Sequence, residues 1–321
     1  MRLGKLDNET LNKIVLSKLK HVRSEVVCAP SVGVDCAAVD LGGRLAVLST
    51  DPITSAVKNI GRLTVQVSCN DAAAAGAEPI GLLVTLLAPP SATIEELDAV
   101  TDELSQTAAL EHVEILGGHT EITDSVTRIV TCATVLAKAG ERGVITPGGM
   151  KEGDSLILTK HAGLEGASII ASEFSMRLHG VTKDELELAC GFVERVSVVK
   201  EGLLAAAFGA TAMHDVTEGG VLGAAWEMAY AAGCGVVIDP EKIPVHPVTK
   251  KLCKELSLDP LRLISSGCML IASANGEALV KKLAEVGVEA AVIGYAQGKD
   301  ARLVDGTSIA PPEADELYKL F

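Results

Sequence analysis

The stretch Asn70-Asp-Ala-Ala-Ala-Ala-Gly-Ala-Glu-Pro79 joins a helix pattern to a strand pattern and organises the first half of the chain. Upstream of it, the helical spacing of apolar residues predicts a helix over Ile60–Ala75. Downstream, the apolar run Pro79–Ala88 predicts a buried strand. The polar pair Asn70 and Asp71 therefore lies near the end of an apolar helix, beside a glycine turn, where functional side chains are often found.

Helix and strand signals alternate on both sides of this stretch. Arg44–Thr50 is a strand-like run, and Thr93 with Glu96 forms the capping box of a helix over Ser91–Val113. The segment Gly140–Gly153 is rich in glycine, so we place a domain boundary there and predict domains 1–145 and 146–321. Mixed helices and strands in both halves predict two α/β or α+β domains. The other expected elements are strands at Val113–Leu116, Val126–Ala137, Asp154–Thr159, Ala210–Met213, Val236–Ile238, Cys268–Ala272 and Ala290–Ile293, helices at Glu165–Glu173, Lys183–Phe208, Gly219–Ala232 and Gly276–Val286, and a turn-like segment at Gly117–Asp124.

Composition narrows the class of protein. The chain has 321 residues, of which 48% are hydrophobic and only 2% aromatic, so its core must be built from Ala, Val, Leu and Ile. It contains no apolar run of the roughly 20 residues that span a bilayer, and Met1–Val15 does not resemble a signal peptide. The eight cysteines form no C-x-x-C pair, which argues against a structural zinc site and a disulfide framework. We therefore expect a cytoplasmic protein that does not bind membranes.

The net charge of −14 restricts the kind of partner that the chain can bind. So acidic a surface repels phosphate backbones, so we expect no nucleic-acid partner. An anionic substrate would need metal ions or helix N-termini to hold it.

Four aspartates occupy strand ends or positions beside glycine turns: Asp35, Asp51, Asp71 and Asp215. Mg²⁺ prefers carboxylate and phosphate oxygens, and several converging carboxylates would repel one another unless cations bridged them. A single aspartate in such a place is more often a loop or cap residue. The combination of four therefore predicts a Mg-triphosphate site.

Two glycine-containing segments could hold phosphate. The first follows an apolar strand and the second opens a helix, where free N–H groups favour anions. An ordinary tight turn and an ordinary helix start remain the alternatives for each. The candidate residues are Gly117, Gly118, His119 and Thr120 in the first segment, and Thr217, Glu218, Gly219 and Gly220 in the second.

Taken in order, these segments resemble the superfamily of aminoimidazole ribonucleotide synthetase, selenophosphate synthetase, thiamine-monophosphate kinase and the hydrogenase maturation factor HypE. The most specific match is Asn70–Pro79, which is similar to the family's Asn-Asp-x4-Gly-Ala-x-Pro stretch. Gly33-Val-Asp-Cys-Ala-Ala, Ser49-Thr-Asp and Gly117-Gly-His-Thr resemble further family segments. His214-Asp-Val-Thr-Glu-Gly-Gly looks like the HypE segment Asp-x-Thr-x-Gly-Gly, so the resemblance is closest to HypE.

The resemblance implies a two-domain PurM-like fold whose N-terminal sheet pairs with that of a second copy to form a barrel. It implies a homodimer that binds ATP and Mg²⁺ in a cleft, with Asp35, Asp51, Asp71 and Asp215 as metal ligands. Asn70, the Gly117–Thr120 segment and the Thr217–Gly220 segment would then contact the nucleotide. His119 and Asp215 are the expected catalytic residues, with His119 polarising the acceptor.

Three departures qualify this expectation. Val34 replaces the first aspartate of a family pair, and His119 stands where many members carry aspartate. HypE ends in a cysteine whose modified thiol is the substrate, whereas here no cysteine follows Cys268. Whether Lys5 reaches over the phosphates stays open.

The predicted function is Mg-ATP-dependent phosphorylation of an amide, carboxyl-type or small-molecule oxygen. The alternatives are a thiamine-monophosphate-type kinase and a catalytically silent ATP-binding scaffold in a maturation complex. The acceptor itself cannot be read from the sequence.

Overall fold

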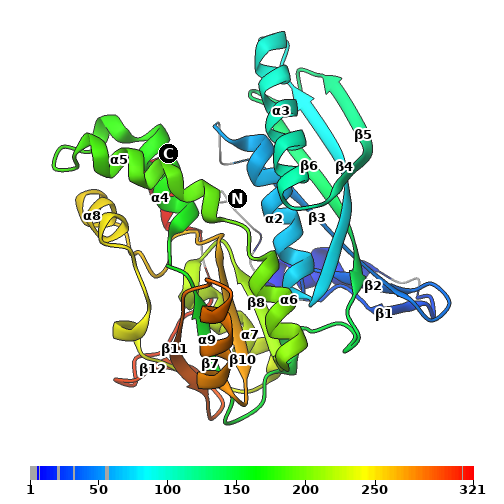
Figure 1. Cartoon of the computed structure of the whole chain (residues 1–321), viewed down its shortest axis with the longest axis vertical. Coiled ribbons are helices and arrows are strands. Elements are labelled where there is room, and N and C mark those ends of the chain that lie inside the picture. The colour runs from blue at the N-terminus through cyan, green and yellow to red at the C-terminus, as the bar shows by residue number, and fades with distance from the viewer. Residues whose placement is uncertain (1–5, 7, 20–21, 32, 55–57, 313) are drawn as a thin grey trace.

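The structure is a computed structural model that describes residues 6, 8–19, 22–31, 33–54, 58–312 and 314–321. Lys5 lies outside these residues. Two six-stranded sheets carry the fold, one in each half of the chain, and helices pack on both (Figure 1). The predicted α+β class with two sheet-containing halves is confirmed.

The N-terminal sheet has the strand order β1-β2-β3-β6-β4-β5. Neighbouring strands run antiparallel except β4 and β5, which are parallel. The helices α2 (Ile60–Ala74) and α3 (Ile94–Leu110) cover one face, whereas the short α1 (Asn8–Ile14) contributes no buried residue. The strands are β1 Val26–Cys28, β2 Ala37–Asp40, β3 Leu45–Ile53, β4 Ala77–Ala88, β5 Glu114–Ile122 and β6 Val130–Ala139.

Local sequence signals account for most of this half. The predicted helix over Ile60–Ala75 is α2, and the predicted capping box of Thr93 and Glu96 opens α3. The turn predicted at Gly117–Asp124 is wrong, because the chain continues as strand β5 through Ile122. Parallel pairing with β4 holds this segment extended, and such a long-range contact leaves no mark in local propensity.

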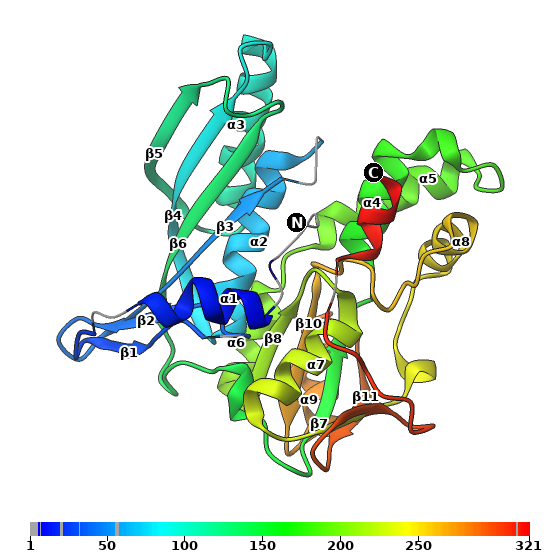
Figure 2. The ribbon, with the colours of Figure 1, turned by 180° about the vertical axis from the view of Figure 1, so that it is seen from behind.

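The C-terminal sheet has the strand order β12-β9-β11-β7-β10-β8. Its two faces are covered by different helices: α7 (Gly220–Ala232) packs on one, and α6 (Val199–Phe208) with α9 (Gly276–Glu285) on the other. Figure 1 looks onto the α9 side and Figure 2 onto the α7 side. The strands are β7 Ser155–Thr159, β8 Ala212–Val216, β9 Val236–Ile238, β10 Cys268–Ser273, β11 Ala290–Ala296 and β12 Ala301–Leu303.

A smaller helical lobe extends from this sheet. It contains α4 (Leu164–Glu173), α5 (Lys183–Cys190) and α8 (Pro247–Leu256), which share one apolar cluster. The final turn, Glu316–Leu320, packs on the same cluster through buried leucines, and Figure 2 shows it lying against α4. The end of the described chain is therefore part of the packed structure.

Helix α2 connects the two halves. Ala73 and Ala74, at its end, share an apolar cluster with α6 and with strand β8. The approach to α6 is close, because a Cβ on Gly202 would lie 2.7 Å from the carbonyl oxygen of Ala73. Only glycine permits this approach, and it brings the end of α2, with Asp71, beside β8.

The domain boundary predicted at residue 145 falls between β6 and β7 and stays a prediction. Among the described residues, no helix has the length and apolar character needed to cross a membrane.

Candidate functional site

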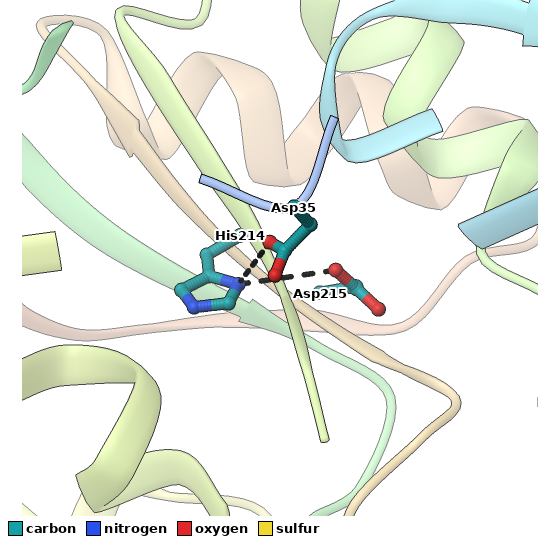
Figure 3. Close-up of side chains that lie close together, drawn as sticks. All are labelled: Asp35, His214 and Asp215. Atoms are coloured by element: carbon teal, nitrogen blue, oxygen red, sulfur yellow. Dashed lines mark ion pairs between the residues drawn. The ribbon is translucent and has the colours of Figure 1, made fainter. Parts of the chain in front are cut away.

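Three side chains from the two halves of the chain meet at one point (Figure 3). Asp35 precedes β2, and the neighbours His214 and Asp215 lie in the fully buried strand β8. His214 Nδ1 is 3.5 Å from Asp35 Oδ2 and 3.8 Å from Asp215 Oδ1. One ligand-capable atom of each residue lies within 4.8 Å of the other two, so together they could hold a metal ion.

Asp71 is buried beside this group. The Ser49 hydroxyl is 2.6 Å from Asp71 Oδ2 and 2.9 Å from the carbonyl oxygen of Asp35, and it can donate to one of them at a time. Burial, followed by the negative charges of Asp215, Asp51 and Asp35, raises the pKa of Asp71 well above its usual value. The fold thus crowds the four sequence-predicted aspartates.

His214 adds a positive charge that sequence reasoning did not assign. Burial opposes its protonation, but Asp35, Asp215 and Glu227 outweigh this effect and raise the pKa of His214 well above its usual value. Its Nε2 lies 3.1 Å from Glu227 Oε2 on α7, which orients the ring. The position of His214 next to Asp215 could have marked it as a site residue in the sequence. Glu227 could not be found in this way, because only the packing of α7 on β8 places it beside His214.

The donor set suits a divalent cation. Asp215 Oδ2 and His214 Nδ1 are buried and have no hydrogen-bond partner among the described residues. Unpartnered buried polar atoms are costly, and carboxylates that crowd together repel each other unless a cation lies between them. Carboxylate oxygens are the ligands that Mg²⁺ prefers, so these residues fit the predicted metal.

The predicted segment Gly117–Thr120 lies elsewhere in the chain. It forms part of β5, which is exposed along its whole length and occupies the edge of the sheet, separated from β2 by three strands. Gly118 is needed there for packing, because a Cβ would lie 1.7 Å from the carbonyl oxygen of Val84. His119 is exposed, with Nε2 3.2 Å from Glu121 Oε2. Within one chain, this segment and the aspartates do not form one site.

Asn70 is fully buried and both ends of its amide are used. Its Nδ2 donates to the carbonyl oxygen of Val196 at 2.9 Å, and its Oδ1 accepts from the N–H of Val198 at 2.8 Å. These bonds tie α2 to the segment that leads into α6. The geometry gives Asn70 a structural role.

The predicted segment Thr217–Gly220 follows β8 and leads into α7. Asp315, from the C-terminal segment, accepts a hydrogen bond from the N–H of Gly219 at 2.8 Å. Tyr318 of the same segment donates to Glu218 Oε1 at 2.9 Å. A carboxylate of the chain itself thus lies at the helix N-terminus where phosphate was expected.

Comparison with known proteins agrees with this architecture. The family model "AIR synthase related protein, N-terminal domain" matches residues 33–139, and the corresponding C-terminal domain matches residues 151–305. The chain is 28% identical over 302 residues to a Methanocaldococcus jannaschii protein named for hydrogenase expression and formation, covering 91% of this chain and 88% of that one. It is also 28% identical over 281 residues to the carbamoyl dehydratase HypE of Rhodobacter capsulatus, covering 83% and 79%.

Two solved structures share the fold. A HypE in complex with ATP superposes with a TM-score of 0.73 at 17% identity, covering 98% of this chain and 97% of that one. A ThiL protein complexed with AMPPCP and TMP superposes with a TM-score of 0.76 at 18% identity, covering 96% and 94%. With both family domains present in order and the PurM-like two-domain fold in place, the chain belongs to the AIR synthase related family.

Proposed function

We propose that the chain is a Mg-ATP-dependent enzyme that phosphorylates an amide, carboxyl-type or small-molecule oxygen. The observation that carries this proposal is the crowding of Asp35, Asp71 and Asp215, together with the buried Asp215 Oδ2, which has no hydrogen-bond partner among the described residues. The ATP complex of a HypE with the same fold and the carbamoyl dehydratases among the relatives support an ATP-dependent function of this general type.

The chain's own residues supply positioning and charge in this proposal. Asp35, Asp71 and Asp215 would hold Mg²⁺, and Ser49 and Glu227 would keep Asp71 and His214 in place. Bound Mg²⁺ would neutralise the phosphate oxygens, which is most of what phosphoryl transfer requires. His214 would stand beside these ligands, oriented by Glu227; without a cation in the site the neighbouring carboxylates raise its pKa, so bound Mg²⁺ would compete with its proton.

The test is calorimetric ATP binding with and without Mg²⁺, together with ADP release on the same sample. The variant Asp71→Asn should weaken Mg-ATP binding at least tenfold, since it removes a ligand charge and leaves the side-chain shape. Asp102→Asn, on the exposed side of α3, is the matched control and should bind as the wild type does. No Mg-dependent binding by the wild type would refute the proposal.

A catalytically silent scaffold is the second candidate, favoured by Val34. This apolar residue lines a small cavity with Asp35 and Asp71, at a position where the family resemblance implies an aspartate. The scaffold predicts Mg-ATP binding without ADP release for any acceptor offered, including thiamine monophosphate. Release of ADP that depends on one acceptor would exclude the scaffold and identify the substrate.

The predicted homodimer belongs to this proposal. The sheet face away from α2 and α3 exposes Ile80 and Leu83 of β4, at 45% and 51%, and all of β5. Pairing of two such faces would cover them, and it would give Gly117–Thr120 of one copy a route to the aspartates of the other. Sedimentation at micromolar concentration should give a dimer, and a monomer would count against this arrangement.

A further inference from the structure

A second cavity lies at the other end of α2 from Asp71. Its volume is about 560 Å³, and it is an open hollow lined by the start of α2, the first turns of α3, and the loops around Pro89 and Thr127. At about 1.5 Å per helical residue, the eleven positions from Ile60 to Asp71 place it roughly 16 Å from the aspartates. In Figure 1 both helices begin toward the upper end of the N-terminal half. The cavity is therefore separate from the cluster of aspartates.

Two cationic side chains, Lys58 and Arg128, line this cavity. Neither forms an ion pair or a side-chain hydrogen bond with any residue that the structure describes. Two cations without an ion-pair partner among the described residues thus lie on one cavity of a chain whose net charge is −14. Both residues are exposed, so a negative group from outside the chain can approach them.

The two carboxylates of the cavity are already engaged. Glu96 Oε2 accepts from the N–H of Thr93 at 2.8 Å, in the capping box of α3. Glu103 Oε2 accepts from the N–H of Gly61 at 3.0 Å, in the first turn of α2. Both carboxylates therefore accept hydrogen bonds from backbone groups at the helix starts.

The local charge balance is positive. Each helix N-terminus is equivalent to about half a positive charge, and α2 and α3 both begin at the cavity. The two termini together offset roughly one of the two carboxylates. With Lys58 and Arg128 added, the cavity carries about one net positive charge, which attracts a negatively charged group.

The uncharged part of the lining is mostly apolar, with Asn59, Ser91 and Thr127 as its polar members. Ile60, Val100 and Ile129 contribute branched side chains, and Pro89, Ala92 and Ala99 complete this surface. Small-molecule sites are typically hollows of about 300–1,000 Å³ with apolar walls and a few charged groups that fix orientation. This cavity has that size, and it offers an apolar surface beside its charged and polar groups.

We propose that this cavity binds a small organic anion, with a phosphate or carboxylate group held by Lys58 and Arg128 and an apolar body against Ile60, Val100 and Ile129. The ligand needs neither ATP nor Mg²⁺, since the aspartates lie at the other end of α2. The inference is independent of the proposed enzyme activity.

The test uses phenyl phosphate and benzoate as probes, with benzyl alcohol as the uncharged analogue. Binding is measured by ligand-observed NMR and calorimetry on full-length protein in EDTA without nucleotide. We expect saturable binding of at least one anion and none of benzyl alcohol. The anion that binds more tightly identifies the ligand as a phosphate ester or as a carboxylate.

The variant Lys58→Gln/Arg128→Gln should weaken anion binding at least tenfold. Lys250→Gln/Lys281→Gln removes the same charge from exposed positions on other helices and should leave binding unchanged. Ala99→Leu, at an exposed position of α3, fills the cavity without altering charge and should also weaken binding. Absence of anion binding by the wild type, or equal loss in both double variants, would overturn the proposal.

Discussion

Glu165 offers a direct test of how the fold treats a buried acid. It is the second residue of α4, its side chain is 5% exposed, and its Oε2 has no hydrogen-bond partner among the described residues. Burial raises the pKa of Glu165 from 4.5 to about 7, and the nearby carboxyls of Asp315 and Glu218 add to this while Ser266 partly opposes it. The folded protein therefore keeps this side chain protonated at pH values where the unfolded chain releases the proton.

The sign and size of the effect follow from linkage. Between pH 4.5 and about 7 the folded state binds one more proton than the unfolded state, so the free energy of unfolding falls as pH rises through this window and levels off above it. At about 1.4 kcal/mol per pH unit, the full loss is roughly 3.4 kcal/mol, of which about 1.3 kcal/mol falls between pH 6 and pH 8. The isosteric variant Glu165→Gln has no proton to lose and escapes this cost.

The assay is urea unfolding of the wild type and Glu165→Gln at pH 6 and pH 8, both above the sequence pI of about 5.0. All other titrating groups are common to the two proteins and cancel when the two pH changes are compared. We expect the variant to gain roughly 1 kcal/mol on the wild type between these pH values. Parallel pH profiles would show that Glu165 is ionised in the fold and would refute the reasoning.

Two further substitutions test the contacts that shape the site and the sheet. Asn70→Ala should lower the free energy of unfolding by roughly 2–4 kcal/mol, because it leaves the buried Val196 carbonyl and Val198 N–H without partners. A loss under 1 kcal/mol in urea unfolding would show that these two hydrogen bonds do not hold α2 to residues 196–198. Gly118→Ala should lower the free energy of unfolding by roughly 1–3 kcal/mol, and with it the melting temperature, since the new Cβ would collide with the carbonyl oxygen of Val84. Gly191→Ala, where a Cβ meets nothing within 4 Å, is the control, and equal melting temperatures of the two variants would contradict the packing argument.

The elements with strong local signals could be predicted from the sequence. Helix α2 carries a sustained apolar pattern, and Thr93 with Glu96 marks the start of α3 by its own hydrogen bonds. The start of strand β5 was predicted at Val113–Leu116, but its continuation through Ile122 was not, because the extended form there depends on pairing with β4, which comes from more than thirty residues earlier in the chain. Residues with the same local appearance can thus form a turn or a strand according to what lies beside them.

The candidate site divides in the same way. Asp35, Asp71 and Asp215 were predicted as site residues because they lie beside glycine turns or strand ends. The fold brings the three together, and their role as metal ligands stays a prediction. Asn70 was predicted as a site residue on the same grounds, yet its amide forms hydrogen bonds with backbone groups of Val196 and Val198. A sequence pattern shows that a polar residue sits in an unusual place, but only its neighbours show whether it is free to bind anything.

The sequence by itself determined the α+β class, the two halves and the family, because these depend on periodicity and on motifs that are short and contiguous. Tertiary structure decided what those motifs contact. It added His214 and Glu227 to the aspartates, set Gly117–Thr120 at the far edge of the sheet, and put the Asp315 carboxylate at the start of α7. The physical reason is that contacts between distant segments depend on strand order and helix packing, which no local stretch of residues encodes.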